Sequence, residues 1–195
     1  SAHLFANKIK GQIKVVTLFA RNRQDGEILS GILECDLVNE ITDLSSDVDL
    51  NLLWISDDAV SAVQEQLNKS VPVVHCSGSV DMNIFDGFTH FGVVYPLQTL
   101  STNRVEGLET FPCLIEANNV DFENMLQEFA LNYISEKTLV INSLERKKIH
   151  VGAVIVNNFT NHLLYLASNF SQKNDFPFEI YQDLMKETIN KAFEI

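Results

Sequence analysis

Basic residues are scarce in this chain of 195 residues. Lys and Arg number 14 against 26 Asp and Glu, which gives a formal net charge of −12. Because nucleic-acid binding requires clustered Lys and Arg that neutralise phosphates, this balance argues against a nucleic-acid partner. It argues equally against an anionic membrane surface. No apolar run approaches the roughly 18 residues of a membrane-spanning helix, so we expect no membrane partner.

Cysteines are also few, and their arrangement excludes two common roles. The three cysteines, Cys35, Cys76 and Cys113, are odd in number and widely spaced. Neither a C-x-x-C motif nor a cluster of Cys with His is present, which argues against a structural zinc site. Each lies in or beside an apolar, strand-like run. We interpret them as buried reduced thiols, and we expect a cytoplasmic protein without a metal site.

The hydrophobic residues, 46% of the chain, alternate between strand-like and helix-like patterns over the first 142 residues. The predicted strands are 14–20, 33–38, 50–55, 72–75, 91–95, 113–117 and 138–142, and the predicted helices are 1–10, 56–67 and 121–135. Continuous apolar strands that alternate with helices predict a mostly parallel sheet covered on both faces. Beyond residue 142 the pattern is wholly helical. The sequence therefore predicts an α/β domain (1–142) followed by a helical domain (143–195).

The segment 143–162 carries a polar stripe. At about 100° per residue in an α-helix, Asn157 and Asn161 lie within about 20° of His150 around the helix axis, and Arg146 lies about 40° from it. A solvated helix face is normally filled with Lys and Glu, so an imidazole and two carboxamides favour a face turned toward a ligand. The alternative is a partly buried helix whose Asn side chains bond to their neighbours. The apolar flank, which we expect to pack between the subunits of a homodimer, comprises Val151, Ile155, Phe159, Leu163 and Leu166.

Four motifs resemble one protein family and occur in the family's order. They are VVHCSGSVDMNIF (73–85), FGVVYPLQTLS (91–101), FPCLIEA (111–117) and ERKKIHVGAVIVNNFTNHL (145–163). The family comprises bacterial proteins with a Rossmann-like dinucleotide-binding domain followed by a helical domain of unknown function, DUF2520. Its relatives include pyrroline-5-carboxylate reductase and coenzyme F420-dependent NADP oxidoreductases. The resemblance implies a Rossmann-like α/β fold with an all-helical C-terminal domain.

One hallmark of a Rossmann domain is missing from the sequence. Such a domain opens with a strand and a G-x-G-x-x-G-like loop whose backbone N–H groups bind the pyrophosphate. The chain has no such loop, and its first residues resemble the helix that follows the loop in the family. We expect a longer protein, because a sheet without its central first strand would have unpaired edges. The alternative is a family member that naturally lacks the loop and binds no pyrophosphate.

The residues FARNR follow a predicted strand whose end selects the cofactor in Rossmann domains. An acidic residue there bonds the ribose 2′-hydroxyl of NAD, whereas Arg accommodates the 2′-phosphate of NADP. The arginines therefore favour NADP over NAD. The resemblance also places the turn 77–78 beside the nicotinamide, although a plain tight turn is the alternative. The predicted cofactor-binding residues are Arg21, Asn22, Arg23, Ser56, Ser77 and Gly78.

His150 is the predicted proton donor, because histidine side chains exchange protons readily near neutral pH. Asn157 and Asn161 would orient a substrate carbonyl or the nicotinamide carboxamide. Gln98 and Thr99, which follow a predicted strand, would line the same cleft between the two domains. Related dehydrogenases use a helical Lys and Asn for these tasks, with a spacing that this chain lacks.

Three classes of function remain at the level of the sequence. The first is an NADP-dependent oxidoreductase that acts on a small carbonyl or imine compound. The second is a non-catalytic NADP-binding or sensing protein that dimerises through its helical domain. The third, a structural interaction protein without a nucleotide, agrees less well with the two arginines and the polar stripe. The sequence does not name the substrate.

Overall fold

The computed structural model describes residues 2–99 and 110–194. The chain divides into two compact units, Ser1–His150 and Val151–Ile195. Helix α5 (Ser143–Ala153) begins in the first unit and ends in the second. Its first residue, Ser143, is also the first residue of the predicted helical domain.

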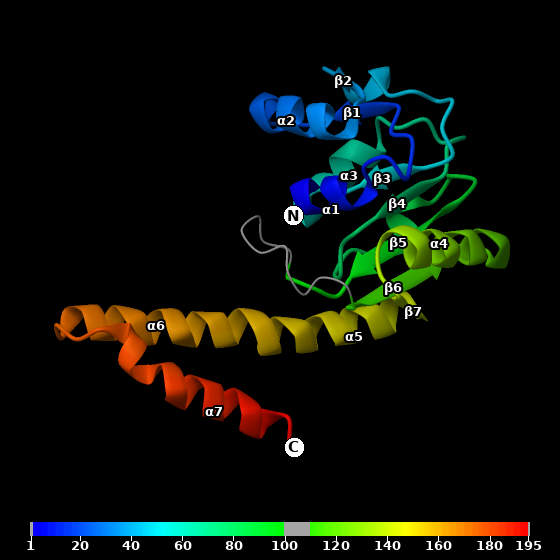
Figure 1. The fold of residues 1–195 in the computed structure, drawn as a ribbon. Coiled ribbons are helices and arrows are strands. Elements are labelled where there is room, and N and C mark those ends of the chain that lie inside the picture. The colour runs from blue at the N-terminus through cyan, green and yellow to red at the C-terminus, as the bar shows by residue number, and fades with distance from the viewer. Residues whose placement is uncertain (1, 100–109, 195) are drawn as a thin grey trace. The chain divides into compact units, whose positions relative to one another are not determined.

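The first unit contains a five-stranded sheet with the strand order β3-β4-β5-β6-β7 (Figure 1). Its strands are β3 (Asn51–Leu53), β4 (Val73–His75), β5 (Phe91–Pro96), β6 (Pro112–Ala117) and β7 (Lys137–Val140). The first three run parallel to one another, and β6 runs parallel to β7. The β5–β6 pair is antiparallel. The predicted mostly parallel sheet is therefore confirmed, with one change of direction at its centre.

A second, two-stranded parallel sheet pairs β1 (Thr17–Phe19) with β2 (Asp36–Val38). Helix α1 (Ala2–Ile9) precedes it, as predicted, and α2 (Arg23–Leu33) connects its strands. The sequence analysis did not identify α2. Its start is fixed by Asn22, whose side chain accepts a hydrogen bond from the Asp25 backbone N–H, a common N-cap arrangement.

Successive residues of a strand point to opposite faces of the sheet, and in the large sheet both faces are covered by other elements. On one face, Val74, Val94 and Ile115 pack against α4 (Val120–Tyr133). On the other, Val73 and Phe91 belong to a core that includes residues of α3 (Asp57–Gln64) and the 3-10 helix η2 (Met82–Phe85). The buried side chains of the α4 core are Val74, Val94, Phe111, Cys113, Ile115, Phe122, Leu126, Ala130 and Ile134. Cys113 is thus a buried thiol, as predicted, whereas Cys35 and Cys76 are only partly buried.

Three polar side chains lie on the sheet face that is turned away from α4. His75 alternates with Val74 in β4, and Tyr95 and Glu116 alternate with apolar residues in the paired strands β5 and β6. The first turns of α5 contact this face, because Arg146 bonds to Glu116 and His150 bonds to Tyr95. This face and the carboxyl ends of β4 and β5 position the candidate site.

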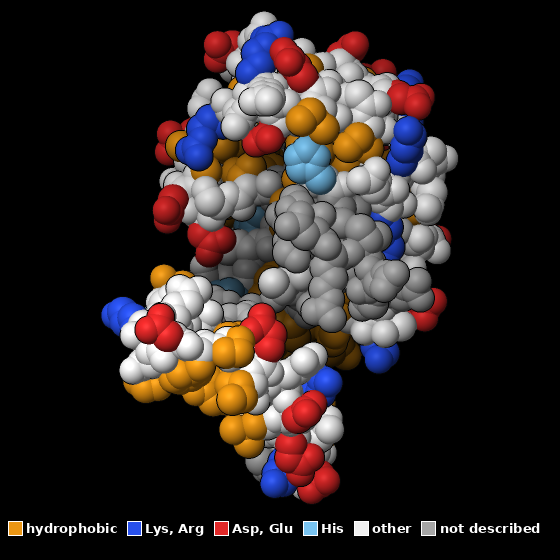
Figure 2. Space-filling model, turned by 60° about the vertical axis from the view of Figure 1, so that its left-hand side comes forward, with side chains coloured by type: hydrophobic (Ala, Val, Ile, Leu, Met, Phe, Trp, Pro, Cys, Tyr) orange, Lys and Arg blue, Asp and Glu red, His pale blue; other side chains and the backbone are white. Residues whose placement is uncertain are grey.

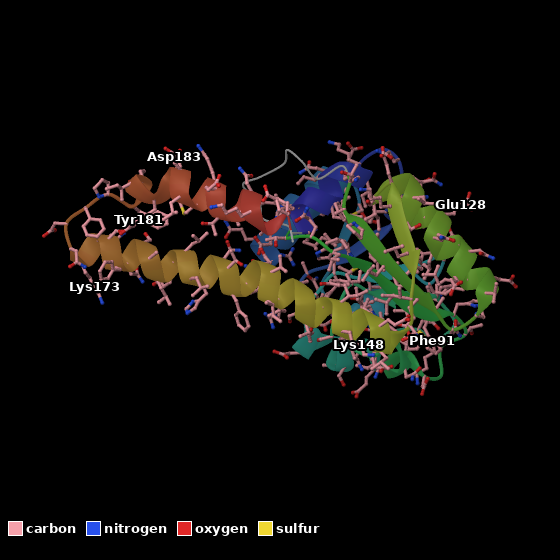
Figure 3. The ribbon with its side chains drawn as sticks, turned by 90° about the horizontal axis from the view of Figure 1, so that it is seen from below. Phe91, Glu128, Lys148, Lys173, Tyr181 and Asp183 are labelled. Carbon is pink, nitrogen blue, oxygen red and sulfur yellow. The ribbon has the colours of Figure 1, made fainter. Side chains whose placement is uncertain are left out.

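The second unit is helical throughout, which confirms the predicted helical C-terminal region. A π-helix (Val154–Phe159) leads into α6 (Thr160–Lys173), and a 3-10 helix (Phe178–Tyr181) precedes α7 (Gln182–Ala192). Lys173 and Tyr181 flank the connection at which the chain reverses (Figure 3). Within the described residues, no helix is long and apolar enough to cross a membrane.

The π-helix corrects the geometry assumed for the polar stripe. A π-helix has i→i+5 hydrogen bonds and therefore a wider turn than an α-helix. The angles calculated at about 100° per residue do not apply across Val154–Phe159. Asn161 Nδ2 nevertheless donates a hydrogen bond to Asn157 Oδ1 at 3.0 Å, so these two side chains lie together.

Many apolar side chains of the second unit are open to solvent. Figure 2 shows them gathered along the C-terminal helices. They include Val151, Ile155, Val156, Phe159, Leu163, Leu166, Phe170, Ile180, Leu184 and Phe193. The expected apolar flank of the segment 143–162 is therefore present and exposed within this unit.

Candidate functional site

The turn that follows β4 is built by a serine. Ser77 Oγ accepts hydrogen bonds from the backbone N–H groups of Ser79 and Val80, at 3.1 and 3.0 Å. The Ser79 hydroxyl donates to Asp57, the first residue of α3. These bonds fix the backbone at the carboxyl end of β4, which is where ligands bind in open α/β sheets.

His75, the last residue of β4, is fully buried beneath this turn. Its Nδ1 accepts a hydrogen bond from the Ser77 backbone N–H at 3.1 Å. Burial, and secondly the positive charge of Arg146, lower the pKa of His75 from 6.5 to about 4. No hydrogen-bond partner of His75 Nε2 exists among the described residues. The side chain is therefore a neutral core histidine that supports the turn.

His150 lies against Gly78, on the outer side of the turn. The Tyr95 hydroxyl and His150 Nδ1 are hydrogen-bonded at 2.9 Å. A Cβ atom on Gly78 would lie 2.6 Å from His150 Cγ and 2.8 Å from Tyr95 Cζ, and closer still to His150 Nδ1. Only glycine fits at this point, because any side chain would displace the imidazole or the phenol. The His150 side chain is partly exposed, and its Nε2 makes no hydrogen bond to the described residues.

A buried ion pair ties α5 to both the turn and the sheet. Arg146 is completely buried, and its Nη2 lies 3.1 Å from Glu116 Oε2. Its Nη1 donates to the Ser77 carbonyl oxygen at 2.9 Å. The Ser143 hydroxyl donates to the same Glu116 oxygen at 2.9 Å and accepts from Arg146 Nη2. The guanidinium is thus occupied by protein groups and unavailable to a substrate.

A second cation on α5 is also paired, but at the surface. Lys147 Nζ lies 2.8 Å from Asp81 Oδ2, and both side chains are more than one-third exposed. The hydrogen bond from Lys147 lowers the pKa of Asp81. Asp81 also accepts from the Asn83 backbone N–H, which caps the 3-10 helix η2.

The structure brings together three of the predicted site residues: Ser77, Gly78 and His150. Among the described residues, no side-chain hydrogen bond joins Ser56 or Gln98 to these three. Ser56 is the exposed residue before α3, and its side chain makes no capping hydrogen bond. Gln98 accepts a hydrogen bond from the backbone N–H of its neighbour Thr99, and both are exposed.

The predicted residues at the carboxyl end of β1 are also all exposed. Arg21 makes no ion pair with the described residues, whereas Arg23 pairs with Glu27 at 3.1 Å and bonds to Asn39. Asn22 serves as the cap of α2. Asn157 and Asn161 belong to the second unit. Their roles as substrate-orienting groups stay predictions.

The sequence analysis missed Tyr95 and Glu116 as parts of this site, and it placed Arg146 only on the polar stripe of His150. A signal was available for two of them, since Tyr95 and Glu116 are single polar residues in otherwise apolar strands. A polar side chain within a buried strand requires a partner. Arg146 could be placed on the same helix as His150, but its burial depends on contacts with distant strands.

Two hollows in the first unit lie away from this site. One of about 190 Å³ is lined by Ile41, Leu44, Asn51 and Gln66, among others. The other, of about 240 Å³, is lined by Lys10, Lys14 and Glu34, among others. Neither touches His150 or Gly78.

Comparison with known proteins defines the class of the fold. A proposed NADP oxidoreductase from Bacteroides fragilis is 27% identical in sequence, with a TM-score of 0.86. The match covers 100% of this chain and 76% of the Bacteroides fragilis chain. A 1-pyrroline-5-carboxylate reductase from Streptococcus pyogenes is 12% identical, with a TM-score of 0.71 and coverages of 98% and 74%. An imine reductase from Myxococcus stipitatus, solved with NADP⁺, is 13% identical, with a TM-score of 0.67 and coverages of 98% and 70%. The last two likenesses concern the fold alone, and the predicted Rossmann-like fold is confirmed.

Residues 111–195 match the family described as a domain of unknown function, DUF2520. This match confirms the resemblance indicated by the motifs. No curated protein matches the chain.

Proposed function

We propose that the protein is an NADP-dependent oxidoreductase that acts on a small carbonyl or imine compound, with His150 as the proton donor. One observation carries the proposal. A partly exposed imidazole is held against a glycine at the carboxyl ends of β4 and β5, which is where such folds bind their ligands. The Bacteroides fragilis and Myxococcus stipitatus relatives, which are described as an NADP oxidoreductase and an NADP⁺-bound imine reductase, support the reaction class.

The side chains at the end of β1 fit the adenosine end of NADP. Arg21 and Arg23 are exposed and basic at the start of α2. The 2′-phosphate would accept charge-assisted hydrogen bonds from these guanidiniums. Arg21 is unpaired among the described residues, and Arg23 would exchange its exposed contact with Glu27 for the phosphate. NADPH, when bound, supplies the hydride.

In the proposed reaction, the chain itself supplies a proton from Nε2 of His150. Addition of a hydride to a C=O or C=N bond leaves negative charge or a free electron pair on the oxygen or nitrogen. Protonated His150 can give the proton on Nε2 to that atom and regain one from solvent. Nδ1 is occupied by Tyr95. The turn 77–79 keeps its backbone fixed beside the imidazole through the bonds to Ser77 Oγ.

The test compares His150→Ala with His162→Ala, a control at an exposed histidine of α6. The assay uses the full-length protein, and NADPH oxidation is followed with a panel of small ketones and cyclic imines. His150→Ala should lower turnover by about 10²–10⁴-fold, with unchanged NADPH affinity, and the control should keep full turnover. NADPH should bind more tightly than NADH, and the double variant Arg21→Ala/Arg23→Ala should lose this preference.

Two results would contradict the proposal. If His150→Ala keeps its turnover, His150 is not the proton donor. Tight NADPH binding without turnover of any carbonyl or imine would favour the alternative, a non-catalytic NADP-binding or sensing protein.

We further propose that the helical unit forms a homodimer. Its exposed apolar side chains extend from α5 to α7, including Phe159, Leu163 and Leu184, which are 57%, 66% and 64% exposed. Contiguous apolar surface of this kind is uncommon on monomers. Sedimentation at micromolar concentration should give a dimer, and Phe159→Glu/Leu163→Glu should give a monomer that is still folded. A wild-type monomer at that concentration would contradict the proposal.

A further inference from the structure

We propose that Tyr95 is the positioning residue of His150: its hydroxyl occupies Nδ1 and leaves Nε2 as the atom that exchanges a proton with the substrate. This inference rests on the proposed function and adds a residue to it. Tyr95 belongs to β5, at the centre of the large sheet, so its backbone is fixed on both sides by β4 and β6.

The geometry around the imidazole distinguishes its two nitrogens. The Tyr95 hydroxyl lies 2.9 Å from Nδ1, and the two rings meet edge to face with centroids 5.7 Å apart. A Cβ built on Gly78 would meet Nδ1 and Cγ first, so the turn covers the same edge of the ring. Nε2, on the opposite edge, has no hydrogen bond to the described residues. One edge of His150 is therefore held, and the other is available.

Tyr95 is suited to remain a neutral phenol. Burial, together with the negative charge of Asp57, raises the pKa of Tyr95, and Arg146 opposes this in part. A phenol can donate and accept a hydrogen bond through the same oxygen. It can donate to Nδ1 when the imidazole is neutral, which leaves the proton on Nε2. When the imidazole is protonated, Nδ1–H can donate to the phenol oxygen instead.

The contact can therefore persist through a catalytic cycle. The imidazolium loses its Nε2 proton to the substrate atom and becomes a neutral ring with its proton on Nδ1. This Nδ1–H donates to the Tyr95 oxygen, so the contact continues to orient the ring. Solvent then returns a proton to the imidazole. An orienting partner of a catalytic histidine acts in this way without touching the substrate.

Tyr95→Phe removes the hydroxyl and retains the ring contacts. The chain offers a matched control in Tyr165→Phe, because Tyr165 also stacks on a histidine, His162, with centroids 6.4 Å apart, but is 61% exposed. The first readout is the ¹⁵N NMR signal of the His150 ring, which reports which nitrogen carries the proton. The wild type should show the Nε2–H form when neutral, and Tyr95→Phe should show a mixture of both tautomers.

The second readout is turnover. Tyr95→Phe should lower kcat by about 10–100-fold, the range found when the partner of a metal-bound histidine is removed, with NADPH affinity unchanged. Tyr165→Phe should alter neither readout. An unchanged His150 spectrum and unchanged kcat in Tyr95→Phe would overturn the inference. A changed spectrum in a protein whose turnover is independent of His150 would overturn the proposed function and support the Tyr95–His150 contact.

Discussion

Replacement of Arg146 by Leu should lower the free energy of unfolding by about 3–5 kcal/mol. Arg146 is fully buried, and its partner Glu116 is 8% exposed at the side chain. The variant leaves the Glu116 carboxylate without a cation in a poorly solvated place, and it leaves the Ser77 carbonyl without its donor. Chemical denaturation at neutral pH, monitored by circular dichroism, measures the loss.

The neighbouring residue provides the control. Lys147→Met also removes one positive charge from α5, but the Lys147–Asp81 pair is about two-fifths exposed. Exposed pairs contribute about 0.2–1 kcal/mol, so this variant should lose no more than that. The double variant Arg146→Leu/Glu116→Leu should recover part of the stability, because it removes both charges. Similar losses for Arg146→Leu and Lys147→Met would show that the buried pair is not what holds α5 to the sheet.

Stability should also fall as the pH is lowered from about 6.5 to about 4, and His75 should cause much of this fall. Its pKa is lowered to about 4 in the folded protein from 6.5. In this window the unfolded chain binds a proton that the folded chain does not, so lowering the pH favours unfolding. The difference corresponds to about 3 kcal/mol in full, of which about 2 kcal/mol is lost by pH 5.

His75→Gln isolates this contribution. A glutamine side chain can accept the Ser77 N–H bond without titrating. The variant should be less stable than the wild type at pH 7.5, because the new side chain fits the buried site less well. It should also lose about 2 kcal/mol less between pH 7.5 and pH 5. Urea denaturation of both proteins at the two pH values measures this difference, and equal losses would exclude His75 as the cause.

The architecture followed from local pattern. Apolar runs of strand length form β4, β5 and β6 and are largely buried. Such continuous runs are typical of strands in a sheet that is covered on both faces. Helix α4 lies where the apolar spacing predicted a helix, and the structure adds Asn119 as its N-cap. Helix α2 was missed because its sequence, RQDGEILSGIL, contains two glycines and few apolar residues. Its stability comes from packing in the first unit, which includes contacts with α1.

The site was accessible from sequence only in part. The sequence placed the turn 77–78 and His150 in one predicted site, and in the structure Gly78 lies against His150. The angles along the polar stripe were wrong as calculated, because six residues form a π-helix that a regular α-helical projection does not anticipate.

The sequence by itself determined the α/β pattern, the helical C-terminal region and the residue types at the strand ends. These depend on hydrophobic periodicity and turn chemistry, which act over a few residues. The tertiary structure alone decided that Arg146 is buried on Glu116, that Tyr95 bonds to His150 and that His75 is a neutral core residue. The first two contacts join residues that are 30 and 55 positions apart in the chain. The burial that sets the charge state of His75 exists only after the sheet and α5 have packed together.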